Sequence, residues 1–297
     1  MNAEFSHEVG LRLVLHSIAT TAARYGRHIE PLLSLSIDFY CRLFIRIDTS
    51  PKEVKALPTK TSLLYYCHDC QTPHTQAFGR VSERVSAKNG HVNLNYHAPT
   101  GPPPGVGEKC GQCGGKYAVS RLQAGSRRGL CGRVLTVFVP VARGQIGGPM
   151  WSAPIHDQAF VQSMLDHVGE NAKDFATADR ITGMLTVAKN EVPNAPFYFT
   201  PAKLCSFFHC TSPPIATFAS ALLNGGFQVS RSHASPGSLK TDASRAYVMD
   251  VVREWIKENP VKMDKVKENS PTFRLLQKEQ TWVTTWLVGT ERGPGGG

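Results

Sequence analysis

Cys67-His68-Asp69-Cys70 and Cys110-Gly111-Gln112-Cys113 are the two stretches that decide how the middle of this sequence folds. Each Cys-x-x-Cys stretch can place two thiolates on one side of a tight turn. The two together therefore predict a tetrahedral, four-sulfur site for Zn²⁺. Because four protein ligands leave no open coordination position, the predicted zinc is structural. The alternative is that the cysteines are paired by chance or form a redox dithiol.

The residues around the cysteine pairs predict a zinc ribbon. The run Leu63-Leu64-Tyr65-Tyr66 approaches the first pair with strand character, and Gly114 and Gly115 follow the second pair. We assign residues 51–119 to a linker and this ribbon, and place the linker at 51–62 because that segment contains prolines and several lysines. The polar stretch between the two pairs has the composition of a loop.

Upstream of the ribbon, the sequence predicts the end of an α/β domain. Apolar residues recur at helical spacing between Ser6, an expected N-cap, and Gly26. The run after Pro31 and the alternation that starts at Tyr40 predict two strands. One helix and two strands do not readily close a core by themselves. We therefore interpret residues 1–50 as the C-terminal remnant of a larger α/β domain.

Downstream of Trp151, the sequence is predicted to be mainly helical, and residues 147–285 are assigned to a C-terminal α+β domain. Its spacing predicts helices over 155–168, 176–191, 201–209 and 215–223, a strand over 227–233, and a helix capped by Thr241 and Asp242. Two short helices, a glycine turn and a strand indicate a winged-helix-like part. The glycine-rich tail 286–297 is expected to be disordered.

The segment 120–146 differs in composition from its surroundings. It contains five arginines, no acidic residue and an apolar run over 134–141. We interpret it as an anomalous basic insertion that resembles translated noncoding sequence. The alternative is an RNA-binding insertion with a hairpin strand.

The overall composition favours a globular protein with a polyanionic partner. Hydrophobic residues make up 41% of the 297 residues, enough for buried cores, and the apolar runs are far shorter than the roughly 20 residues of a membrane-spanning helix. The net charge of +10 favours nucleic acid or an acidic membrane surface. Eight cysteines, four of them in the two pairs, suit a reducing compartment, and the N-terminus lacks the pattern of a signal peptide. We expect no transmembrane segment and no secretion.

Several motifs in the same order resemble the C-terminal part of the tRNA guanine-N2 dimethyltransferase family. The first runs from Glu30-Pro31 through Ser34-Leu35-Ser36-Ile37-Asp38-Phe39-Tyr40 to Arg46-Ile47, and the paired cysteines follow it. The later ones are Gly147-Gly148-Pro149-Met150-Trp151 with Pro154-Ile155-His156, and Ser232-His233 through Lys240-Thr241-Asp242-Ala243. The resemblance covers about residues 7–280, apart from the insertion. It implies that residues 1–50 are the α/β end of a Rossmann-like, S-adenosylmethionine-dependent methyltransferase domain and that residues 147–285 bind tRNA. It implies S-adenosylmethionine-dependent transfer of two methyl groups to N2 of guanine 26 in tRNA, with S-adenosylmethionine as cofactor and tRNA as partner.

Two elements of that family are not found in the sequence: the glycine-rich strand-turn-helix site for the methyl donor and the acidic-proline catalytic motif. We therefore assign no catalytic or cofactor-binding residue, interpret the chain as truncated at its N-terminus and expect it to be inactive alone. The alternative is a noncatalytic zinc-ribbon RNA-binding module. The family resemblance implies the nucleus, the mitochondrion or both, otherwise the cytoplasm, and no subunit interface is specified.

Basic residues near the predicted helix pair and strand are candidates for phosphate contacts that would position a folded RNA. They are Lys203, His209, Arg231, His233 and Lys240. The alternative for each is an ordinary solvated basic surface. Arg42 and Arg46 share one strand face and could approach RNA, but we favour salt bridges with the missing part of the α/β domain.

His156 and Trp151 are expected to have structural roles. We favour a role for His156 in fixing the chain where the ribbon joins the helical part over one in acid–base chemistry. Trp151 and Trp255 are expected in cores.

Overall fold

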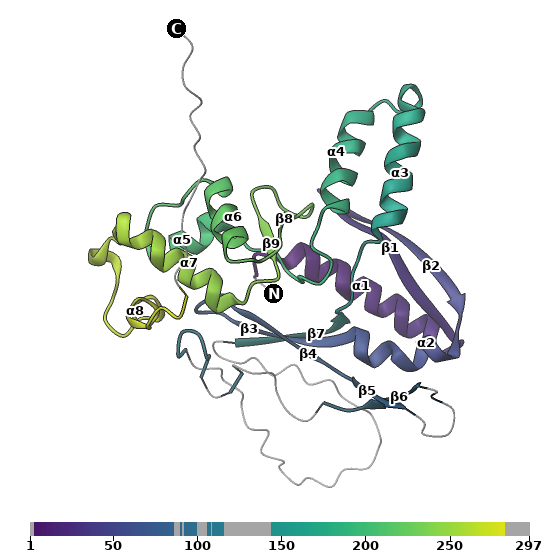
Figure 1. The fold of residues 1–297 in the computed structure, drawn as a ribbon, viewed down its shortest axis with the longest axis horizontal. Helices are drawn as coiled ribbons and strands as arrows, with labels where there is room; N and C mark the ends of the chain where they lie inside the picture. The colour runs from purple at the N-terminus through teal and green to yellow at the C-terminus, as the bar shows by residue number, and fades with distance from the viewer. Residues whose placement is uncertain are drawn as a thin grey trace.

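A computed structural model describes residues 3–85, 90, 92–99, 106–107, 109–115 and 144–282 of the chain. Its helices are α1 (Ser6–Ala23), α2 (Pro51–Ala56), α3 (Gln158–Glu170), α4 (Ala178–Lys189), α5 (Pro201–Phe208), α6 (Ile215–Asn224), α7 (Arg245–Glu258) and α8 (Pro271–Gln277). Its strands are β1 (Arg27–Ile37), β2 (Tyr40–Thr49), β3 (Thr61–Cys67), β4 (Pro73–Ala77), β5 (Arg80–Val85), β6 (Val92–His97), β7 (Gly144–Trp151), β8 (Val229–Arg231) and β9 (Leu239–Thr241). Figure 1 shows their arrangement.

The N-terminal part is a helix packed on a two-stranded antiparallel hairpin, as the sequence predicts. β1 and β2 pair from Arg27↔Thr49 to Ile37↔Tyr40, with an irregularity between Pro31 and Leu33. Side chains alternate across β2, so that Leu43 and Ile45 pack with the core beneath α1 while Phe44 packs on the other side. The hairpin therefore has two apolar faces, each covered by a different part of the chain.

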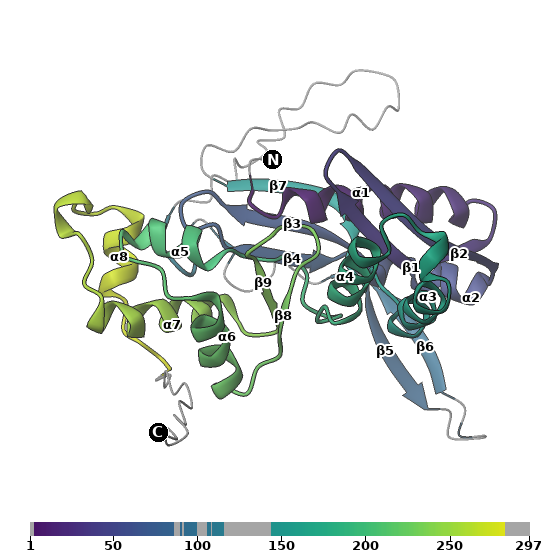
Figure 2. The same ribbon diagram turned by 90° about the horizontal axis from the view of Figure 1, so that it is seen from above.

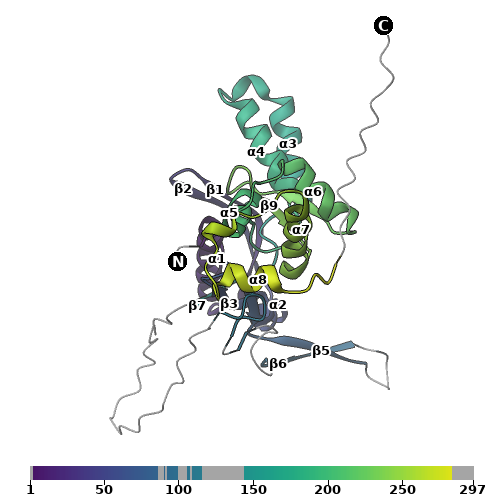
Figure 3. The same cartoon turned by 90° about the vertical axis from the view of Figure 1, so that its left-hand side faces the viewer.

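The other face of the hairpin is covered by α3 and α4, which form a helical hairpin that projects beside it (Figures 1 and 3). Leu33 and Leu35 of β1 share a buried cluster with Val161 of α3 and Leu185 of α4. Residues that are separated by more than a hundred positions in the sequence thus build one core.

The middle of the chain forms a three-stranded antiparallel sheet of order β4-β3-β7. α1 lies between this sheet and β1 (Figure 3). Leu64 and Met150 of the sheet pack with Phe5 and Val9 at the start of the helix. β5 and β6 form a separate hairpin that extends from this sheet (Figure 2).

The C-terminal part consists of α5, α6, the β8–β9 pair, α7 and α8, shown on the left of Figure 1. α7 contributes Val248, Val251 and Val252 to its core, and Phe218 of α6 is fully buried there. Phe199 forms an isolated antiparallel bridge with Leu239, which extends the β8–β9 pair by one short segment.

Several boundaries differ from the sequence-based predictions. Ser50 caps α2 by accepting from the N–H of Glu53, so most of the predicted linker 51–62 is helical. Ser244, not Thr241 or Asp242, caps α7. The two predicted caps were wrong because Thr241 ends β9. Ser6 is the first residue of α1 rather than its cap.

Two further segments contain strands where loop or insertion was expected. The polar stretch between the cysteine pairs contains β5 and β6. Residues 144–146, the end of the proposed insertion, belong to β7 and pair with Tyr65, Tyr66 and Cys67. The rest of the insertion, 120–143, and the tail 286–297 lie outside the described residues. None of the helices that the structure describes is long and apolar enough to cross a membrane.

Candidate metal centre and nucleic-acid interface

The four cysteines of the two Cys-x-x-Cys stretches converge on one point. The sulfurs of Cys67 and Cys113 lie 3.7 Å apart and those of Cys70 and Cys110 lie 3.6 Å apart. A Zn²⁺ ion with Zn–S bonds of about 2.3 Å requires sulfurs about 3.8 Å apart along each edge of a tetrahedron. A disulfide would require about 2.05 Å. The described cysteine geometry therefore fits a four-sulfur metal site.

The backbone around the cysteines is arranged for this convergence. The N–H of Gly115 points at the Cys113 sulfur, 3.4 Å away. A Cβ at Gly115 would stand 2.3 Å from a carboxylate oxygen of Asp69 and 3.1 Å from that sulfur. A side chain at this position would therefore require the Asp69 carboxylate to move and would press on the Cys113 sulfur.

The cysteine cluster is continuous with the core of the C-terminal part. All four sulfur-bearing residues share one buried cluster with residues of α5, α6, α7 and α8. Arg274 of α8 also donates to the carbonyl of Cys113 at 2.7 Å. The geometry of the two turns is therefore coupled to the packing of the helices.

A second buried cluster joins the N-terminal and C-terminal parts through charged side chains. The Glu191 carboxylate accepts from the Nδ1 of His233 at 2.6 Å and from the Lys240 ammonium at 2.6 Å. The same ammonium lies 3.1 Å from Glu8 of α1, and Glu8 also pairs with Arg12 at 2.8 Å. The exposed fraction of each of these five side chains is 2% or less. We call this set, together with His156, the ion network.

Two imidazoles of the ion network close the outer edge of β1. The backbone N–H of Ser34 donates to Nδ1 of His156 at 3.4 Å, and that of Ser36 donates to Nε2 of His233 at 3.3 Å. The opposite ring nitrogens, which carry the protons, face Glu191 at 3.5 and 2.6 Å. His156 therefore fixes the chain at the junction, as the sequence analysis favoured, and Asp157 next to it caps α3.

The ligand atoms of His156, Glu191 and His233 lie within 4.8 Å of one another, so a metal site is an alternative reading of this cluster. A metal on the ring nitrogens that face Glu191 would require protons on the opposite nitrogens. Those opposite nitrogens accept hydrogen bonds from the backbone N–H groups of Ser34 and Ser36. With a metal bound, each ring N–H would therefore point at a backbone N–H, and both are donors. The Lys240 ammonium adds a positive charge at the same place. The geometry fits hydrogen-bonded ion pairs rather than a metal.

The pKa values of the ion network follow from its burial and its charges. Burial alone would raise the pKa of Glu191, but the hydrogen bonds from His156 and His233 and the charge of Lys240 outweigh it and hold the pKa far below its ordinary value. Glu8 shows the same balance. Burial raises its pKa, but the charges of Lys240 and Arg12 lower it by more, so that the pKa lies below its ordinary value. Burial lowers the pKa of His156, against the opposing effect of Glu191. In the ion network the two carboxylates are therefore charged at neutral pH, and His156 is neutral.

The five predicted RNA-contacting residues divide into two groups. Lys203 on α5 and Arg231 on β8 are exposed, and His209, the left-handed C-cap of α5, is half-buried. Lys240 and His233 belong to the ion network, where the ammonium already has two carboxylate partners. In this structure neither of these two side chains can contact a phosphate. No local sequence signal distinguishes them from the exposed group.

The structure also separates the two arginines of β2. Arg46 pairs with Glu30 of β1 at 2.9 Å, so its salt bridge lies within the hairpin itself and not with a missing part of the domain. Arg42 instead lies over the ring of Tyr40, 5.7 Å from its centroid. Trp151 is 3% exposed in the core beneath α1, as expected, whereas Trp255 is only half-buried and donates to the carbonyl of Thr211.

Fold and sites define a class of protein: an α/β hairpin layer is joined by a buried ion network to a cysteine-containing α+β part. The chain as a whole has a net charge of +10, which is typical of nucleic-acid-binding proteins. Comparison with known proteins gives the family. The profile of the N2,N2-dimethylguanosine tRNA methyltransferases matches residues 1–253, so the chain belongs to that family.

Relatives with established names agree with this assignment. The chain is 36% identical over 288 residues to the human tRNA (guanine(26)-N(2))-dimethyltransferase, which covers 97% of this chain and 38% of that protein. The enzyme of the same name from Schizosaccharomyces pombe is 36% identical, covering 95% of this chain and 45% of that protein. The mitochondrial enzyme from Saccharomyces cerevisiae is 34% identical, with coverage of 95% and 45%. The chain thus spans less than half the length of these relatives.

A solved structure shares the fold. Trm1 from Pyrococcus horikoshii, in complex with S-adenosyl-L-methionine, superposes with a TM-score of 0.59 at 17% sequence identity. The match covers 84% of this chain and 51% of that one. The chain therefore shares its fold with about half of that methyltransferase.

Proposed function

We propose that the chain forms the RNA-gripping part of a tRNA (guanine(26)-N(2))-dimethyltransferase that uses S-adenosylmethionine. The observation that carries the proposal is the family match over residues 1–253, which spans the α/β hairpin, the cysteine cluster and most of the C-terminal helices. The cofactor would supply the methyl groups. The named relatives include enzymes of this activity, one of them mitochondrial, which agrees with a nuclear or mitochondrial location.

The zinc ribbon is part of this proposal. Cys67, Cys70, Cys110 and Cys113 hold one structural Zn²⁺, and the ion fixes the two turns against α8. Its contribution is to folding, because binding of the metal releases free energy only when the four thiolates are brought together. The ribbon therefore supports the surface on which tRNA lies.

The C-terminal part is proposed to act as a winged-helix-like platform. The order Phe199 bridge, α5, α6, β8 and β9 supports this interpretation, because the Phe199 segment pairs with β9. α6 contains no basic residue. Phosphate contacts are therefore assigned to Lys203 and Arg231, with His209 beside them.

A guanine in a folded tRNA must leave its stack before N2 can be methylated. A protein that exposes it must hold the RNA on either side with contacts that do not depend on sequence. The exposed basic side chains of α5 and β8 can provide such contacts. No described residue is assigned as the base that removes the N2 proton.

The test is tRNA binding by the purified chain, combined with metal analysis. We expect about one zinc per chain and an affinity that falls steeply with salt. Lys203→Gln with Arg231→Gln should reduce the slope of log affinity against log salt by about 2. The control is Lys173→Gln, at the exposed far end of the α3–α4 hairpin. An affinity that does not depend on salt, or equal slopes in all variants, would contradict the proposal.

Methyl transfer separates the proposed enzyme from the noncatalytic alternative. The full-length protein should transfer methyl groups from S-adenosylmethionine to guanine 26, and it should lose this activity when guanine 26 is replaced. Tight tRNA binding by a full-length protein that transfers no methyl group would instead support a noncatalytic RNA-binding module.

A further inference from the structure

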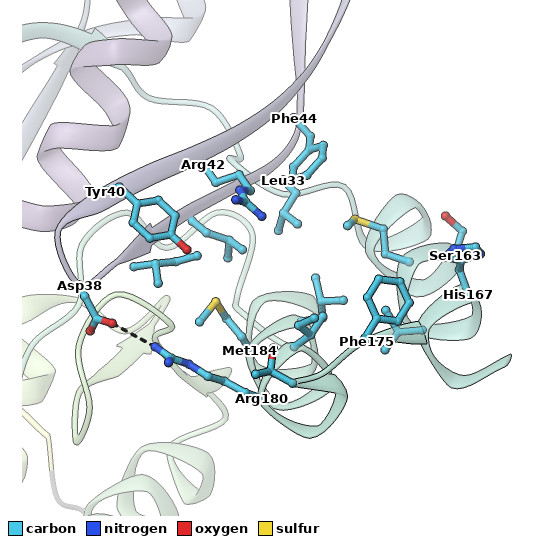
Figure 4. A pocket seen from close by; sticks show the side chains of 17 residues that line it. Leu33, Asp38, Tyr40, Arg42, Phe44, Ser163, His167, Phe175, Arg180 and Met184 are labelled. Carbon is cyan, nitrogen blue, oxygen red and sulfur yellow. Dashed lines mark hydrogen bonds and ion pairs between the residues drawn. The ribbon is translucent and has the colours of Figure 1, made fainter. Parts of the chain in front are cut away.

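A cleft of about 650 Å³ lies between the β1–β2 hairpin and the α3–α4 hairpin (Figure 4). Its volume falls in the range of roughly 300–1,000 Å³ that small ligands occupy. The floor is apolar and includes Leu33, Leu35 and Met184. The rim is different: it carries aromatic and basic side chains from both hairpins.

One wall of the cleft is a row of alternating residues on β2. Tyr40, Arg42 and Phe44 line the cleft, as expected for every second residue of a strand. Tyr40 as a residue is 53% exposed, and the Arg42 guanidinium lies over its ring, 5.7 Å from the centroid. Among the ion pairs of the described residues, none involves Arg42, whereas Arg46 on the same strand face is paired with Glu30. A cation and an exposed ring are thus available at the same rim.

The opposite wall comes from the α3–α4 hairpin. His167 and Phe175 line it near the helical turn, and their rings are 6.2 Å apart. Arg180 stands at the mouth and pairs with Asp38 at 3.0 Å, which neutralises the acidic group that lines the cleft there. The rim therefore presents a positive charge and flat apolar surfaces to whatever enters.

We propose that this cleft takes an unstacked nucleobase of the RNA, with the ring of Tyr40 and the guanidinium of Arg42 against the base or its phosphate. Unpaired bases are recognised by stacking on aromatic side chains and on arginine, and their phosphates by cations. The aromatic and basic alternation on β2 provides these groups, and Arg42, which takes part in none of the ion pairs of the described residues, favours an anionic occupant. The inference rests on the proposed function, because it names a further contact with the same RNA.

The experiment measures binding of the purified chain to a tRNA transcript and to a short single-stranded RNA that contains 2-aminopurine. Tyr40→Leu removes the ring and should weaken both affinities about tenfold, whereas Tyr40→Phe should bind as the unchanged chain does. Arg42→Gln should weaken binding more than the matched change Arg46→Gln. The fluorescence of 2-aminopurine should fall on binding, and Tyr40→Leu should reduce that change.

The outcomes separate this inference from the proposed function. If tRNA binding depends on Lys203 and Arg231 but is unchanged in Tyr40→Leu, the base-binding inference is overturned and the proposed function stands. If the single-stranded RNA binds through Tyr40 but tRNA does not bind, the inference stands and the proposed function fails. Self-association of the chain that Tyr40→Leu abolishes, with RNA affinity unchanged, would place a second copy in the cleft and overturn the inference.

Discussion

The ion network makes a strong prediction for Glu191→Gln. The substitution keeps the shape of the side chain but removes the charge that accepts from Lys240 and His233 at 2.6 Å each. Lys240 and Arg12 would then share the single buried charge of Glu8. Breaking a buried ion pair by removing one partner costs about 3–5 kcal/mol. Because Gln can still accept one hydrogen bond, we expect a loss of about 3 kcal/mol in the free energy of unfolding.

The assay is equilibrium urea unfolding at neutral pH, followed by tryptophan fluorescence. Trp151 is a suitable reporter, because its carbonyl accepts from Arg12 of the ion network. The control is Asp38→Asn, which breaks the exposed pair with Arg180 and should cost less than about 1 kcal/mol. Adding Lys240→Met to Glu191→Gln should restore part of the loss, since it removes the unpaired cation.

A loss below about 1 kcal/mol in Glu191→Gln would refute this reasoning, because so small a cost is typical of exposed ion pairs. So would a double variant whose loss in the free energy of unfolding equals or exceeds the sum of the losses of the two single variants. The first result would mean that water reaches the carboxylate, and the second that Lys240 does not depend on Glu191.

Three further predictions concern the cysteine turns and the pH dependence. Cys67→Ser should lower the zinc content and also the unfolding temperature of the C-terminal helices by circular dichroism, because they share one core; unchanged metal content would remove the site assignment. Gly115→Ala should reduce zinc retention against a chelator, since its Cβ would meet Asp69 at 2.3 Å, and retention equal to that of the unchanged chain would show that the turn can relax. Stability should be greatest above about pH 6.5 and fall in two steps as pH decreases. The first step begins near pH 6.5, because His156 has a lowered pKa in the folded protein and is protonated more readily in the unfolded chain. The second begins below about pH 4.3, because Glu191 and Glu8 also have lowered pKa values and take up protons more readily in the unfolded chain. Unfolding temperatures measured from pH 8 to pH 3 test this, and a flat profile would contradict it.

The sequence predicts the parts of this protein whose signals are local. Two Cys-x-x-Cys stretches specify a cluster regardless of the length of chain between them, because a surface loop closes at little extra cost per residue. The helical and strand periodicities of the first 50 residues are equally local. Ser50 followed by Pro51 was also a helix start signal, although the prolines and lysines favoured a linker.

The ion network could not be predicted from local patterns. Glu8 and Glu191 lie far apart in the sequence, and nothing beside either carboxylate indicates that it is buried. Lys240 and His233 were therefore interpreted as part of a basic surface. Their burial depends on tertiary packing that brings α1, β1 and β9 together, which pairs charges that a single sequence presents as isolated.

The imidazoles on the outer edge of β1 have a consequence for self-association. An unpaired strand edge offers N–H groups to which a strand of another molecule can add. On β1 the backbone N–H groups of Ser34 and Ser36 already donate to ring nitrogens of His156 and His233. These two N–H groups therefore cannot form the hydrogen bonds that an added strand would need. This border should resist the growth of intermolecular sheets, and a chain that lost both rings would expose a template for aggregation.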